Sequence, residues 1–154
     1  MSIAIETVIV FMEALELKDY ERAASNLADS MFFSGFTPKP LPKDQFIAVM
    51  SGLTEGFPDL SYMFHGAKEV DNTSEGASVT GTVHITGTQT DSFQLPPLGI
   101  GPVPQTAQSI SLPEETWDYL VREGMIASIR VDHVPGGDME GLLNQLGIDY
   151  PIVQ

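Results

Sequence analysis

Hydrophobic residues recur with two different periods along this chain. In the first third they recur every three or four residues, as on one face of an α-helix. This spacing predicts helices over residues 3–17, over residues 20–27 with Asp19 as the N-terminal cap, and over residues 42–56 with Pro42 in the first turn. A short strand over residues 31–33 is expected between the second helix and the third.

From residue 61 onward the period changes to two, which is typical of strands with one buried face. Strands are expected over residues 61–70, 77–90, 108–122 and 125–134, followed by a helix from Asp138 to Gly147. The alternation gathers apolar residues on one face, namely Val79, Val83, Ile85, Trp117, Tyr119, Ala127, Ile129 and Val131. Helices followed by a strand meander indicate an α+β fold, in which N-terminal helices cover a curved antiparallel sheet. Residues 1–154 are expected to form a single domain.

Residues 91–107 interrupt the strands with four prolines among leucine and isoleucine residues. A long, apolar segment of this kind predicts either a lid or an interface element.

Two polar residues fall on the apolar face, Gln89 and His133. Histidine can exchange a proton near neutral pH, so His133 is the first candidate for a general acid or base, although it could instead bond a loop carbonyl. Asp138 follows two glycines and is either the cap of the last helix or a second catalytic residue at the mouth of a pocket. If the faces of the sheet are reversed, His84 and Asp132 become the candidates instead.

Four large residues are candidates for the wall of an apolar pocket: Trp117, Tyr119, Phe32 and Met50. Packing in the core is the simpler interpretation of all four, and contact with a flat ligand is the second.

Three segments in sequence order resemble the SnoaL-like polyketide cyclase group of the NTF2-like superfamily. They are Phe57-Pro58-Asp59-Leu60, then Gly87-Thr88-Gln89-Thr90 with Leu95-Pro96-Pro97-Leu98-Gly99, and finally Gly141-Leu142-Leu143-Asn144-Gln145-Leu146-Gly147. The resemblance implies a cone-shaped sheet around a small-molecule pocket and a homodimer. The cyclases of this group close a polyketide ring by an intramolecular aldol step, without metal or cofactor.

The chain departs from that group at two positions. The histidine of the group's second segment falls on Gln89, which can bond a carbonyl but cannot act as an acid or base near neutral pH. The group's acidic residue falls near Val131 or Asp132 when counted from the preceding turn, and on Asp138 when counted back from the last helix.

Composition excludes several classes of function. The formal net charge is −14, from 21 acidic and 7 basic residues, so nucleic acid and anionic membranes would be repelled. Cysteine is absent and the three histidines are scattered, so neither thiolate chemistry nor a metal site is expected. The N-terminal segment has no basic region and no cleavage site, which favours a cytoplasmic protein.

Two functional hypotheses remain open. The first is a cofactor-free aldol cyclase or isomerase for an apolar carbonyl compound, with His133 as the base and Gln89 as a hydrogen-bond donor to the enolate. The second is a non-catalytic module that binds an apolar ligand or forms a dimeric interaction surface.

Overall fold

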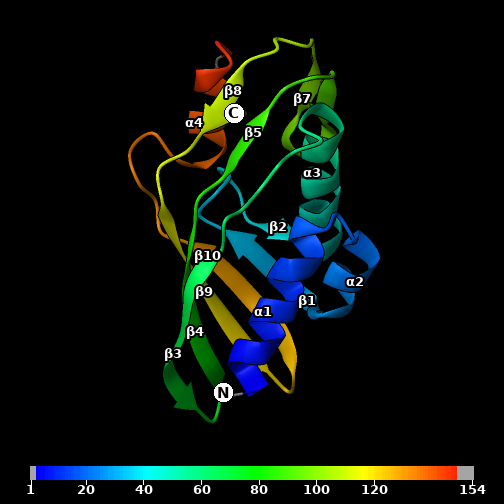
Figure 1. Cartoon of the computed structure of the whole chain (residues 1–154). Helices are drawn as coiled ribbons and strands as arrows, with labels where there is room; N and C mark the ends of the chain where they lie inside the picture. Colours follow the sequence, from blue (N-terminus) through cyan, green and yellow to red (C-terminus); the bar gives the residue numbers. More distant parts are fainter. Residues whose placement is uncertain (1–2, 149–154) are drawn as a thin grey trace.

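The computed structural model describes residues 3–148, in which helices cover one face of a six-stranded sheet (Figure 1). The helices are α1 (Ile3–Glu16), α2 (Tyr20–Ser25), α3 (Lys43–Gly56) and α4 (Asp138–Gln145), with a short 3-10 turn, η1 (Pro96–Leu98). The strands are β1 (Leu27–Ser34), β2 (Leu41–Pro42), β3 (His65–Thr73), β4 (Gly76–Val83), β5 (Thr86–Thr88), β6 (Phe93–Leu95), β7 (Ile100–Val103), β8 (Ser109–Ser111), β9 (Glu115–Arg122) and β10 (Met125–Val131).

The main sheet has the order β2-β1-β10-β9-β4-β3. Adjacent strands of this sheet are antiparallel, except that β1 and β10 are parallel. The expectation of a purely antiparallel sheet is therefore wrong for this pair. No hairpin turn joins two strands so far apart in the sequence, and local patterns therefore do not reveal their direction.

Two of the predicted long strands are each divided in two. The strand predicted over residues 77–90 becomes β4 and β5, and the one over residues 108–122 becomes β8 and β9, with Pro113 in the second break. Proline has no N–H to donate to a ladder, so it ends the pairing there. The upper pieces, β5 and β8, pair with each other as a separate two-stranded sheet.

Residues 91–107 pack their apolar side chains into the core. They make the β6–β7 hairpin, whose buried side chains are Phe93, Leu95, Leu98, Ile100 and Val103. The hairpin lies directly against α3, since a Cβ added at Gly56 would be only 2.5 Å from the ring of Phe93. Close packing of this kind holds the segment in place.

Helix α4 lies against the upper part of the sheet (Figure 1). The side-chain amide of Gln145 accepts from the backbone N–H of Ser111 at 2.8 Å and donates to its carbonyl at 2.8 Å. Gln145 thus pairs with β8 as a neighbouring strand would, which fixes the position of α4.

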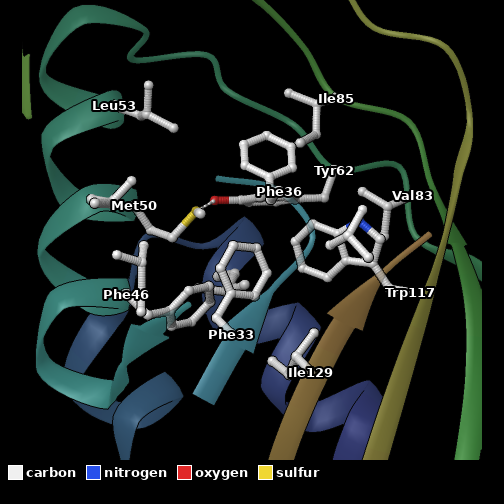
Figure 2. Packing of buried hydrophobic residues seen from close by; sticks show 14 of the residues in the cluster. Phe33, Phe36, Phe46, Met50, Leu53, Tyr62, Val83, Ile85, Trp117 and Ile129 are labelled. Carbon is white, nitrogen blue, oxygen red and sulfur yellow. Dashed lines mark hydrogen bonds between the residues drawn. The ribbon is translucent and has the colours of Figure 1, made fainter. Parts of the chain in front are cut away.

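Aromatic side chains fill the space between α3 and the sheet (Figure 2). The ring of Phe33 lies 4.5 Å from that of Phe46 and 5.4 Å from that of Trp117, measured between centroids. The rings of Phe36 and Tyr62 lie 6.4 and 6.5 Å from Trp117. At this cluster the predicted pocket is therefore occupied by core side chains.

Phe32 does not belong to this cluster. It is 54% exposed, whereas its neighbour Phe33 is fully buried, because successive residues of β1 point to opposite faces. The interpretation of Phe32 as a core or pocket residue is wrong, and Phe33 takes that place.

Candidate functional site

A buried carboxyl group, that of Glu115, lies at the start of β9 on the inner face of the sheet. Glu115 is 3% exposed and shares its face with the buried residues Trp117, Tyr119 and Val121. The sequence interpretation overlooked it, although the same alternation that selected Trp117 and Tyr119 also includes position 115.

Asp138 and His133 are brought into contact at the edge of the sheet beside Glu115. A carboxylate oxygen of Asp138 is bonded to Nδ1 of His133, whose side chain remains 66% exposed. Asp138 is not the cap of α4, because that position is taken by Gly137 and no side chain caps the helix. The backbone of Asp138 has a φ of 65°, a left-handed conformation that costs of order 1–3 kcal/mol outside glycine.

Glu115 and Asp138 form a carboxyl pair. The backbone N–H of Asp138 donates to Oε1 of Glu115 at 3.2 Å. Burial, together with the neighbouring Asp138 side chain, raises the pKa of Glu115 to about 8, and the hydrogen bond from the backbone N–H of Asp138 opposes this shift. Two carboxylates this close cannot both ionise easily, so Glu115 holds a proton at neutral pH.

Glycines allow the residues before α4 to close over this pair. A Cβ added at Gly137 would be 2.8 Å from Oε2 of Glu115, and one added at Gly141 would be 2.0 Å from the carbonyl oxygen of Gly136. A larger residue at either position would push the chain away from Glu115. The short Gly136-Gly137 segment is therefore what lets Asp138 reach both Glu115 and His133.

Four buried side-chain atoms within residues 3–148 have no hydrogen-bond partner, and all four lie on β9 or on the residue packed against its first residue. They are Oε2 of Glu115, Oδ1 of Asp138, Nε1 of Trp117 and the hydroxyl of Tyr119. Three belong to alternate inward residues of β9, and the fourth belongs to the residue packed on Glu115. Buried polar atoms are normally paired, so each of these four atoms calls for a physical explanation.

Gln89 is buried on the inner face, as the alternation predicted, but its amide is fully engaged. Its nitrogen donates to the carbonyls of Asp91, Val103 and Pro104, and its oxygen accepts from the hydroxyl and the N–H of Thr106. Gln89 holds the ends of the 91–107 segment together, which leaves no donor for a ligand.

Met50 lies in the core with Trp117, and its sulfur accepts from the hydroxyl of Tyr62 at 3.5 Å (Figure 2). The reversed-sheet alternative receives no support. His84 bonds the hydroxyl of Ser111 on the other face, and Asp132 is exposed and paired with Arg130.

A groove of about 650 Å³ lies elsewhere, between α1 and the start of β3. None of the site residues expected from the sequence lines it. Its lining residues are Ile5, Ile9, Met12, Glu13, Glu16, Phe64, His65, Gly66 and Ala67.

Within residues 3–148, no three or more acidic or histidine side chains are grouped so as to hold a metal ion. None of the helices in that part of the chain is long and apolar enough to cross a membrane.

Comparison with solved structures shows which fold the chain has. AclR of Streptomyces galilaeus, a candidate hydroxylase, matches with a TM-score of 0.69 and 16% identity over 92% of this chain and 79% of its own. IdmH of Streptomyces antibioticus, a candidate polyketide cyclase, matches with a TM-score of 0.67 and 18% identity over 93% and 97%. A candidate SnoaL-like polyketide cyclase of Jannaschia sp. CCS1 matches with a TM-score of 0.64 and 18% identity over 83% of both chains.

The chain therefore has the NTF2-like α+β fold that SnoaL-like polyketide cyclases share. This confirms the resemblance expected from the three sequence segments, at the level of fold. No protein-family model matches the sequence, and no curated protein matches it. Since one fold of this kind serves many reactions, the chemistry has to be argued from the site itself.

Proposed function

We propose that the protein is a cofactor-free enzyme that moves a proton on an apolar carbonyl compound, as an isomerase or an aldol cyclase does. The observation that carries this proposal is the contact between Asp138 and His133, backed by the buried, protonated Glu115. The SnoaL-like polyketide cyclase among the proteins of the same fold supports the reaction class.

Each residue of the group has a distinct role. Asp138 bonds Nδ1 of His133, which leaves Nε2 free to act as the base. Nε2 removes a proton from the carbon next to the carbonyl group, and the electrons of the broken C–H bond move into the enolate. The proton then returns to another carbon, which completes an isomerisation, or to the oxygen formed when the enolate attacks a second carbonyl group. One such base contributes about 10²–10⁴ in rate.

Deuterium exchange into 2-tetralone tests the proposal without knowledge of the natural substrate. In D₂O, proton NMR should show that the wild-type protein accelerates loss of the protons next to the carbonyl group. His133→Ala should abolish the acceleration with little change in melting temperature, and Asp138→Asn should reduce it strongly. Asp29→Asn, which removes a fully exposed carboxylate, should leave it unchanged. Equal exchange in wild type and His133→Ala would refute the proposal.

The groove between α1 and β3 favours a second candidate function, the binding of an apolar ligand without catalysis. Its volume of about 650 Å³ falls in the range of about 300–1,000 Å³ that small-molecule sites occupy. The homodimer and the cytoplasmic location expected from the sequence stay predictions, and light scattering on the purified protein checks the first.

A further inference from the structure

The groove between α1 and β3 has two chemically different ends. Ile5 and Ile9 line it near the start of α1, and Glu13 and Glu16 line it near the end of that helix. At 1.5 Å per residue, Ile5 and Glu16 are about 16 Å apart along the helix axis. The groove is therefore apolar at one end and acidic at the other.

The acidic end carries two carboxylates, those of Glu13 and Glu16. Glu13 is exposed and makes no ion pair with a described residue, and α1 has no basic residue in its last turn. Glu16 is held in place because its carboxylate accepts from the N–H of Tyr62 at 3.0 Å and from the hydroxyl of Ser61 at 3.2 Å. Lys18 donates to the backbone carbonyls of Glu16 and Leu60 and does not line the groove.

The net charge of the chain as a whole, −14, increases the negative potential at this end. The one imidazole on the lining, that of His65, lies 3.4 Å from the carboxylate of Glu114. A cation is attracted to this end of the groove, and an anion is repelled.

Phe64 provides the apolar wall opposite α1. Its ring lies against Gly81, where an added Cβ would be 2.2 Å from the ring, and it meets the ring of Tyr119 edge-on at 6.0 Å. Phe64 is only partly buried, and Met12 completes the apolar lining from the helix side.

We propose that this groove binds an amphipathic amine, a molecule with an apolar body and a single positive charge. The body lies on Ile9, Met12 and Phe64, and the ammonium group lies beside Glu13 and Glu16. The inference rests on the second candidate function, in which the groove holds an apolar ligand, and it is independent of the chemistry at His133.

The contribution of the head group to binding can be separated from that of the apolar body with three ligands that share one alkyl chain. They are decylamine, decanol and decanoate. Each is titrated below its micelle concentration at low salt, with calorimetry and the fluorescence of Trp117, the sole tryptophan, as readouts. Decylamine should bind about tenfold more tightly than decanol, and decanoate should not bind measurably. Glu13→Gln should weaken decylamine about two- to fivefold and leave decanol unchanged. Glu55→Gln removes the same charge from an exposed position on α3 and should have no effect.

A variant that fills the groove tests whether the ligands bind there. Ala67→Leu adds volume to the lining from β3 and should weaken both decylamine and decanol. Amide NMR shifts caused by decylamine should centre on residues 63–67 and on α1. Equal binding of all three ligands would refute the amine class but keep the apolar-ligand function. Absence of binding would refute both the amine class and the apolar-ligand function. A dimer that Ala67→Leu dissociates would also refute both, because a second copy of the chain would then occupy the groove.

Discussion

The raised pKa of Glu115 makes a specific prediction about how stability depends on pH. Below the ordinary glutamate value of 4.5 this carboxyl is protonated in both the folded and the unfolded chain. Between 4.5 and about 8 the unfolded chain releases the proton and the folded chain keeps it, so the free energy of unfolding falls as pH rises. Above about 8 both states are ionised and the loss is complete.

The size of this loss follows from the pKa. Each pH unit between the two values is worth about 1.4 kcal/mol, so Glu115 lowers the free energy of unfolding by at most about 5 kcal/mol across this range. Glu115→Gln keeps the size and the oxygen that accepts from the backbone N–H of Asp138, but it cannot ionise. The variant should match the wild type near pH 5 and exceed its stability by several kcal/mol near pH 9.

Urea unfolding followed by circular dichroism at pH 5, 6, 7, 8 and 9, at constant ionic strength, measures this difference. Glu114→Gln is the matched control, because Glu114 is the adjacent residue but its side chain is 60% exposed. The control should follow the wild-type curve within about 1 kcal/mol. Parallel curves for wild type and Glu115→Gln over the whole range would show that Glu115 has an ordinary pKa and would refute the reasoning.

Three other substitutions test the packing around the site. Gly137→Ala places a methyl group 2.8 Å from the Glu115 carboxyl and should cost about 1–3 kcal/mol in thermal unfolding, whereas Gly101→Ala, with open space around it, should change stability by less than about 0.5 kcal/mol. Gln89→Leu removes five hydrogen bonds to the following segment and should cost about 2–4 kcal/mol in urea unfolding; unchanged stability would contradict its role. Gln145→Ala removes two hydrogen bonds to the backbone of β8 and should cost about 1–2 kcal/mol, and slower amide exchange in α4 than in the wild type would contradict this.

Much of the fold was predictable because it depends on periodicity. The four helices begin within a residue or two of their predicted starts, and Asp19 caps α2 by accepting from the N–H of Arg22. The apolar face was also predicted, since Val79, Trp117, Tyr119 and Ile129 are all buried together. The breaks in the long strands, the β6–β7 hairpin, the exposed position of His133 beyond the end of β10 and the direction of β1 relative to β10 were not predicted.

The candidate site was predicted in part. His133 and Asp138 were both selected, but their contact was not, because it depends on how the Pro135-Gly136-Gly137 segment turns. Glu115 was not predicted as a site residue, because its burial and its contact with Asp138 arise only where the segment before α4 packs on β9. Gln89 was assigned to a ligand because its five hydrogen bonds to the segment that follows cannot be inferred from residue spacing.

The sequence by itself determined where the helices begin and which side of β4 and β9 faces inward, because both follow from interactions among residues a few positions apart. Tertiary structure decided which distant segments meet: the loop before α4 on Glu115, aromatic rings in the space expected to be hollow, and α1 beside β3 with a groove between them. The pKa of a carboxyl group and the shape of a binding site depend on these long-range contacts. Burial and neighbouring charges are set by tertiary packing and not by local sequence.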